Sequence, residues 1–265
     1  MDKTIELVNN VKDIHAMPGV IVKALNLMKK PTTSMKELGD IVMYDQSLTI
    51  KILALVNSAY YGFSQQISSI NIALSLLGMV KVKNIIVAVA MKPMMSNQGD
   101  KELWKHSMRV AAGCEYLANL TKVMDADEAF ISGFVHDVGK TVLHMTNEKL
   151  YSKVVAAVND GADILDAEKK YFDSDHVKTG SLLAKRWQLP ILLANIISYH
   201  HTPSLSSIPV PCNLVCLIDK LVQDNFNPSV LDKDFIKTLG IDFEDIEDLR
   251  TTILQKADVL ISELS

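Results

Sequence analysis

Residues 133–140, with the sequence GFVHDVGK, contain the adjacent pair His136 and Asp137 in a stretch that we interpret as a helix or the edge of one. Neighbouring side chains on a helix point about 100° apart, so a metal ion at the helix edge can contact both. Imidazole and carboxylate groups are both good ligands for zinc, iron and manganese. The pair therefore predicts a metal site, in which the Asp137 carboxylate could bridge two ions.

Candidate ligands occur in further segments of the chain, and five of its seven histidines are among them. Glu102 and His106 are four positions apart, which places them on one helical face. Asp219 lies in the mostly apolar stretch 214–222, where an unpaired carboxylate would be costly to bury. The helices of a bundle can bring such scattered ligands together around one or two divalent ions of iron, manganese or zinc. The predicted metal ligands are Glu102, His106, His136, Asp137, His176, His200, His201 and Asp219.

Some of these residues have a second interpretation. Glu102 could be a solvated acid in the first turn of a helix. His201 could support another ligand or lie in an exposed loop. Cys212 and Cys216 share the helical face of Asp219 and could bring a thiol near the site, although small buried cysteines are more common than such a site.

Apolar residues recur at intervals of three and four along much of the chain, as in Leu48, Ile52 and Leu55. Ser34 and Glu37 match a capping box, in which each side chain satisfies a backbone amide of the other residue. No alternating strand pattern is long enough to predict a sheet. The sequence therefore predicts an all-α fold, which a sheet of three or more strands would contradict.

A short polar segment, SNQGD at residues 96–100, separates two strongly apolar regions. We interpret it as a loop between two helical lobes that pack together, since it is short and both of its flanks are apolar. The predicted division is residues 1–97 as the N-terminal lobe, 98–225 as the metal-site lobe and 226–265 as a helical C-terminal tail.

The composition argues against several classes of function. The 27 Lys and Arg residues and 31 Asp and Glu residues give a formal net charge of −4, so there is no basic footprint for a nucleic acid polymer. The apolar run at 85–95 is broken by Lys92 and Pro93 and is shorter than the roughly 20 residues of a membrane span. Three cysteines and a polar N-terminal stretch predict a cytoplasmic location with no membrane attachment.

A family resemblance begins in the first hundred residues, in MPGV at 17–20, DQSLT at 45–49, VNSAYYG at 56–62 and INIALSLLG at 70–78. These stretches resemble the HDOD family, the HD-related output domain of bacterial signalling proteins. WKHS at 104–107, residues 133–140, RWQLP at 186–190 and YHH at 199–201 extend the resemblance to roughly residues 10–225. It implies an all-helical fold with an HD-domain-like core in the C-terminal lobe, and a regulatory role with no established general reaction.

The resemblance also implies roles for individual residues. The HD pattern of a His, a His-Asp pair and a distal Asp matches His106, His136, Asp137 and Asp219. The other candidate ligands resemble the larger ligand set of the HD-GYP phosphodiesterases. Lys140 resembles the lysine that faces substrate phosphate in those enzymes, so it is the predicted catalytic residue.

One departure from the HD-GYP pattern follows the adjacent histidines. Residues 202–207 are TPSLSS, where an HD-GYP enzyme has an acidic, glycine-rich segment ending in Gly-Tyr-Pro. The stretch 202–209 also contains no Arg or Lys to neutralise a bound phosphate. This departure argues against efficient hydrolysis of cyclic-di-GMP.

Two functions from different classes remain open. The first is a signalling module that contacts an unidentified protein partner, with the metal in a structural or sensory role. The second is a metal-dependent phosphohydrolase or phosphodiesterase that acts on a nucleotide or cyclic dinucleotide. Tyr60 and Tyr61 in the VNSAYYG segment could serve such a protein partner or pack between the lobes.

Overall fold

The computed structural model describes residues 3–10, 34–44, 46–95 and 102–265, and these form α-helices and short 3-10 helices without any β-strand. The prediction of an all-α fold is therefore confirmed. The α-helices are α1 (Lys3–Asn10), α4 (Met35–Tyr44), α5 (Gln46–Val56), α6 (Ile70–Leu77), α7 (Met79–Met95), α8 (Glu102–Thr121), α9 (Ala126–Val135), α10 (Val138–Thr146), α11 (Glu148–Asn159), α12 (Ile164–Phe172), α13 (His176–Arg186), α14 (Ile191–Tyr199), α15 (Pro209–Leu221), α16 (Lys233–Lys237) and α17 (Ile246–Leu264). The 3-10 helices are η2 (Pro203–Leu205), η3 (Pro228–Val230) and η4 (Phe243–Asp245).

Polar side chains fix the starts of several helices. The predicted capping box begins α4: the Ser34 amide donates to Glu37 Oε2 at 2.8 Å, and the Glu37 amide donates to Ser34 Oγ at 3.2 Å. Asp175 caps α13, where its carboxylate accepts from the Lys178 amide at 2.8 Å. Because α13 begins at His176, this cap also holds the backbone of a predicted metal ligand.

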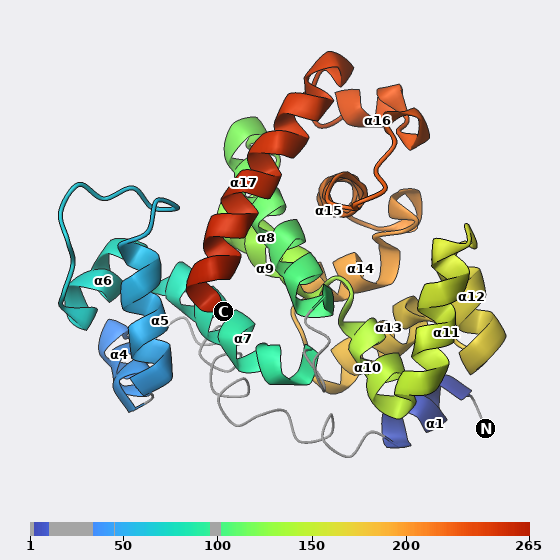
Figure 1. Ribbon diagram of the computed structural model, residues 1–265, viewed down its shortest axis with the longest axis horizontal. Coiled ribbons are helices and arrows are strands. Elements are labelled where there is room, and N and C mark those ends of the chain that lie inside the picture. The colour runs from blue at the N-terminus through green and yellow to red at the C-terminus, as the bar shows by residue number, and fades with distance from the viewer. Residues whose placement is uncertain (1–2, 11–33, 45, 96–101) are drawn as a thin grey trace.

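The helices form two groups with α8 and α9 side by side between them (Figure 1). Helices α4, α5 and α6 lie at one end, and α10 to α13 lie at the other. Helix α1 packs against α10 and α13, far from it in sequence. There the Thr4 and Ser174 hydroxyls are 2.8 Å apart, and Arg186 donates to Asn9 at 2.6 Å.

One hydrophobic core extends through both groups of helices. It contains Ile52 and Leu74 from α5 and α6 together with Trp104 and Phe134 from α8 and α9. Each fully buried side chain of this kind contributes roughly 1.5–3 kcal/mol, so this core holds α5 and α6 to α8 and α9. The loop predicted at 96–100 lies outside the described residues, and the division into lobes stays a prediction.

Helix α17 joins the two largest hydrophobic clusters. Leu249 and Ile253 belong to the cluster built with α8 and α15, whereas Leu260 belongs to the cluster that reaches α5. Gly113 permits this close approach, because a Cβ there would lie 2.5 Å from Ile218 Cγ2 and 2.9 Å from Ile253 Cγ2. The C-terminal region is therefore part of the core.

The segment at 56–62 is tied to the α8–α9 pair by a polar network. Tyr60 donates from its hydroxyl to Glu115 Oε2 at 2.5 Å. Lys81 forms an ion pair with the same carboxylate and lies 3.4 Å from Asp127. The sequence left two interpretations of Tyr60, contact with a protein partner or packing within the molecule. These contacts favour packing within the molecule.

Among the described residues, no single helix is both long and apolar enough to cross a membrane. Helices α6 and α7 reach the required length and composition only as a pair, and the pair is bent by 108°.

Candidate metal centre

The break between α9 and α10 carries the adjacent pair found in the sequence. Helix α9 ends at Val135 and α10 begins at Val138, which leaves His136 and Asp137 at the junction. Gly139 lets α13 approach this junction, because a Cβ there would lie 1.9 Å from the carbonyl oxygen of His176. The close crossing of α10 and α13 thus brings Asp137 to His176.

Two groups of potential metal ligands meet at this junction and share Asp137. Within each group the ligand atoms all lie within 4.8 Å of one another. Together they contain seven of the eight predicted ligands, from α8, α13, α15, the α9–α10 junction and the end of α14. The first group is His106, His136, Asp137 and Asp219, and the second is Asp137, His176, His200 and His201.

The two oxygens of Asp137 face different groups. Its Oδ2 lies 3.1 Å from His136 Nε2 and 3.5 Å from His106 Nε2. Its Oδ1 lies 3.3 Å from His176 Nε2 and 3.5 Å from His200 Nε2. This arrangement suits a carboxylate that bridges two positions.

Hydrogen bonds on the far side of each ring turn the Nε2 atoms toward the centre. His136 Nδ1 lies 2.7 Å from the Gly133 carbonyl oxygen, and His200 Nδ1 lies 3.1 Å from that of Ile196. An N–H donated from Nδ1 leaves Nε2 with the lone pair that a metal requires.

His176 has an acidic partner that sequence reasoning missed. Glu168 on α12 is fully buried, and its Oε2 lies 2.7 Å from His176 Nδ1 and accepts from the His176 amide at 2.8 Å. Burial raises the pKa of Glu168 to about 8. No local pattern distinguishes Glu168 from the other charged residues of α12, so only the packing of α12 on α13 reveals it.

The chemistry of the centre fits a transition metal ion. His106 Nε2, His136 Nε2 and Asp137 Oδ1 are buried and make no hydrogen bond of good geometry among the described residues, although other ligand atoms of the centre lie 3.0 to 3.5 Å away. Buried polar atoms are rarely left without a partner, since each costs about 1–3 kcal/mol. Mixed nitrogen and oxygen donors are typical of zinc, iron and manganese sites.

Coupled charges perturb the ionisation of these groups. Burial lowers the pKa of His136, but the carboxylates of Asp137 and Asp219 outweigh this effect and raise the pKa to about 10. Burial raises the pKa of Asp219, but contacts with His106 and His136 outweigh it and hold the pKa well below its usual value. Burial lowers the pKa of His201 to about 4, which keeps that ring neutral.

The remaining candidates divide clearly. His201 belongs to the centre, with its Nε2 2.9 Å from His176 Nε2. Glu102 belongs to neither ligand group: its side chain is 69% exposed and pairs with Lys105 at 2.6 Å. This position agrees with the alternative of a solvated acid in the first turn of α8. Cys212 and Cys216 are buried free thiols outside both groups.

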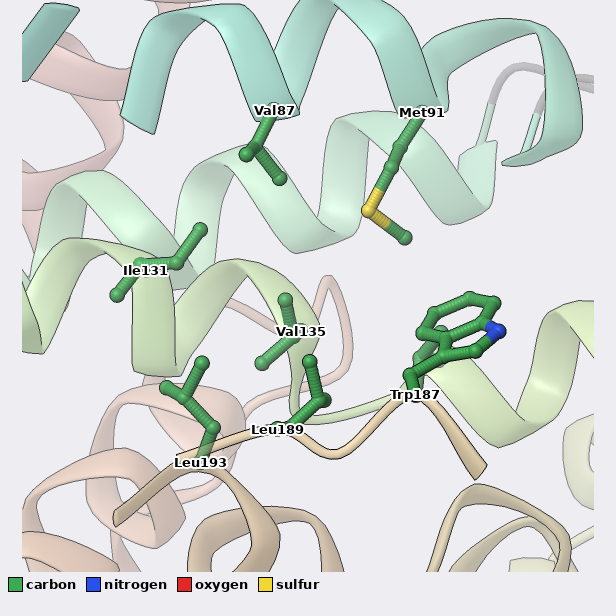
Figure 2. Close-up of a pocket in the computed structure, with 8 residues that line it drawn as sticks. Val87, Met91, Ile131, Val135, Trp187, Leu189 and Leu193 are labelled. Atoms are coloured by element: carbon green, nitrogen blue, oxygen red, sulfur yellow. The ribbon is translucent and has the colours of Figure 1, made fainter. Parts of the chain in front are cut away.

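A small apolar hollow of about 10 Å³ lies beside the His136–Asp137 junction. Val135 and Val138, which flank the pair, both line it. Figure 2 shows Val87 and Met91 projecting from α7 toward Val135 and Leu189. All of its described lining residues are apolar or aromatic, and none of the candidate ligands is among them.

Residues 14–203 match the family model of the HDOD domain. The chain belongs to the HDOD family. The matched span contains His106 through His201 but ends before Asp219, so one residue of the first ligand group lies beyond the matched HDOD region.

Two curated proteins align with this HDOD chain over part of their length. An uncharacterized protein of Treponema pallidum is 25% identical over 202 residues, which are 74% of this chain and 39% of that protein. The uncharacterized protein YuxH of Bacillus subtilis is 28% identical over 151 residues, which are 56% of this chain and 36% of that protein. The HDOD chain therefore spans well under half the length of these relatives.

Solved structures share the fold over most of the chain. An HDOD domain protein of unknown function from Geobacter sulfurreducens has a TM-score of 0.79 at 23% identity, covering 93% of this chain and 92% of that one. A Shewanella amazonensis protein, provisionally named a phosphohydrolase, has a TM-score of 0.75 at 22% identity, with 98% of both chains covered. A Marinobacter aquaeolei protein, provisionally named a signal transduction protein, has a TM-score of 0.75 at 19% identity, covering 94% of this chain and 58% of that one.

Lys140 is held beside Asp137, the residue shared by the two candidate ligand groups. Its Nζ lies 2.5 Å from Asp137 Oδ2, and its side chain is 16% exposed. Burial lowers the pKa of Lys140, but the adjacent carboxylate of Asp137 outweighs this effect and raises the pKa. The positive charge of Lys140 is therefore compensated within the protein.

Proposed function

We propose that this HDOD protein is a bacterial signal-transduction module with a mono- or dinuclear transition-metal centre that has a structural or sensory role. The observation that carries the proposal is the buried Asp137 carboxylate shared by two groups of ligands. The fold shared with the provisionally named signal transduction protein of Marinobacter aquaeolei supports a regulatory role.

The geometry favours two metal positions over one. The first would be held by His106, His136 and Asp219, the second by His176, His200 and His201, and Asp137 would bridge them. Iron, manganese and zinc all suit this donor set.

Metal-dependent phosphoester hydrolysis is the second candidate function. A bound divalent metal supplies a hydroxide nucleophile and stabilises phosphate charge. It is favoured by the complete HD pattern at His106, His136, Asp137 and Asp219, and by the fold shared with the provisionally named phosphohydrolase. It is disfavoured by the segment 202–207, which contains no cation, and by the engagement of Lys140 with Asp137.

The proposal includes three features expected from the sequence. The module would act in the cytoplasm, would transmit its signal to a protein partner, and would consist of the two lobes and C-terminal region divided at about residues 97 and 225. A nucleotide is the small ligand that its phosphohydrolase-like centre would accept.

Metal content tests the first function. Protein purified without chelators should contain one or two equivalents of transition metal by elemental analysis. Asp137→Ala should remove the metal and destabilise the protein by about 3 kcal/mol or more, because His136 and Lys140 lose their buried counter-charge. Asp166→Ala is the control, since that side chain is 79% exposed. Wild-type protein that takes up no iron, manganese or zinc would refute the proposal.

Turnover separates the two functions. Cyclic-di-GMP and mononucleotides should be hydrolysed weakly or not at all by manganese- or iron-loaded protein under reducing conditions. Robust hydrolysis that disappears in Asp137→Ala would establish the enzyme instead of the regulatory module.

A further inference from the structure

We infer that Arg109 is the anion-recognition residue of this centre and binds the oxygens of phosphate or a phosphoester at its open edge. The inference rests on the proposed metal centre and extends it to the class of ligand. Arg109 was not among the residues that the sequence analysis selected.

Exposure of the ligand side chains shows which edge of the centre is open. His136, His176 and His200 are fully buried, and Asp137 is 1% exposed. By contrast, 24% of the His106 side chain and 10% of the Asp219 side chain are exposed, and His201 is also partly exposed. A ligand from solvent would therefore reach the metal past His106, Asp219 and His201, and α8 and α15 form one edge of this opening.

Arg109 lies at this edge. It follows His106 by three positions on α8, so the two side chains share a helical face and lie about one turn apart. The Arg109 side chain is 26% exposed, close to the value for His106. Its guanidinium extends toward the end of α15, where it lies 3.5 Å from Asp224 Oδ1.

Most of the donor capacity of Arg109 is unused within the described structure. The Asp224 side chain is 96% exposed, and a contact of this length to a solvated carboxylate is weak. Arg109 Nε is buried and has no hydrogen-bond partner among the described residues. A guanidinium offers five N–H donors in a planar fork that matches two oxygens of a phosphate.

The neighbouring lysines on α8 and α10 are already engaged. Lys140 pairs with Asp137 at 2.5 Å, and Lys105 pairs with Glu102 at 2.6 Å. The segment 202–207 supplies no Arg or Lys after the two adjacent histidines. Arg109 therefore provides from α8 the positive charge that this segment does not supply.

Binding of inorganic phosphate to manganese-loaded protein tests the inference. Calorimetry should show that Arg109→Ala weakens phosphate binding tenfold or more, because two charge-assisted hydrogen bonds are lost. Arg109→Lys keeps the positive charge but loses the planar pair of N–H donors, so it should weaken phosphate binding by a smaller factor. If the alanine variant does not fold, the phosphate affinity of this lysine variant tests the inference. Lys105→Ala is the matched control on the same helix and should bind phosphate as the wild type does.

Manganese content, measured first, separates this inference from the proposed function. If wild-type protein takes up no manganese or other transition metal, the proposed function fails and the inference with it. If the protein loads metal but does not bind phosphate, or if both Arg109 variants bind phosphate as the wild type does, the inference alone is overturned.

Discussion

At the scale of single residues, the role of His176 depends on Glu168. The buried Glu168 carboxyl group lies 2.7 Å from His176 Nδ1, which directs Nε2 to Asp137 Oδ1 at 3.3 Å. Partners of this kind fix the orientation and raise the basicity of a ligating histidine. Their loss weakens metal binding even though the partner never contacts the metal.

We predict that Glu168→Ala weakens metal affinity by about 10- to 100-fold. Glu168→Gln should reduce metal affinity by a smaller factor, because its amide oxygen can still accept a hydrogen bond from His176 Nδ1. The measurement is a titration against a chromophoric chelator, with the exposed Asp166→Ala on the same helix as control. Equal affinity in the wild type and both Glu168 variants would exclude a role for this residue in metal binding.

The charge on His136 predicts how metal affinity depends on pH. With a pKa raised to about 10, His136 is protonated at neutral pH without metal, whereas only the neutral ring can bind a metal. Metal binding should therefore release about one proton from His136, and affinity should rise by about tenfold per pH unit between pH 6.5 and 8.5. Calorimetry in buffers of different ionisation enthalpy measures the proton release. Affinity that does not change over this range would contradict the prediction.

At the scale of helices, the centre depends on how closely α10 and α13 cross. Gly139 is the contact point, since a Cβ there would lie 1.9 Å from the His176 carbonyl oxygen and 2.8 Å from the Gly180 amide nitrogen. Both of these atoms belong to the backbone, so no side chain can move aside. The crossing sets the distance between Asp137 and His176.

Gly139→Ala should therefore lower the free energy of unfolding by about 1–3 kcal/mol or more and weaken metal binding. Gly39→Ala is the control in α4, because its Cβ would meet its nearest neighbour, Leu74 Cδ1, at an ordinary 3.5 Å. That variant should be neutral or up to about 1 kcal/mol more stable, as expected for Ala in a helix. Urea denaturation measures the free energy of unfolding of both variants. If Gly139→Ala is as stable as Gly39→Ala, α10 and α13 can move apart without loss of stability, which would contradict the prediction.

At the scale of the whole molecule, α17 links the metal-site helices to the helices of the N-terminal group. Ile253 is fully buried against α8, whereas Leu260 packs in the cluster that includes α5. Since one cluster spans both groups, we expect a single cooperative unfolding transition.

Ile253→Ala should lower the free energy of unfolding by about 2–5 kcal/mol through the lost burial and the cavity. The exposed Thr251→Ala on the same helix is the control. Thermal unfolding followed by far-UV circular dichroism, which reports the helices of both lobes, and by metal release, which reports the metal-site lobe, should shift by the same amount in the Ile253 variant. Two separate transitions would mean that the lobes unfold independently.

The sequence by itself determined the helices and the chemical type of the site. The recurrence of apolar residues at three and four is a local property, and so is the capping box of Ser34 and Glu37, which the structure reproduces. The stretches around NSAYYG and GFVHDVGK were specific enough to predict the HDOD family. Seven of the eight predicted ligands then meet in the structure, because their residue types and helical positions were visible in the sequence.

Only the tertiary structure decided which side chains meet and what each one faces. It placed Glu102 in solvent, gave Asp137 to both ligand groups and brought Glu168 behind His176. It also left Arg109 at the open edge and packed α17 into the core. These outcomes depend on crossings between helices that are distant in sequence. Such crossings are set by close contacts such as that of Gly139 against His176. The periodicity of apolar residues along one helix carries no information about these contacts.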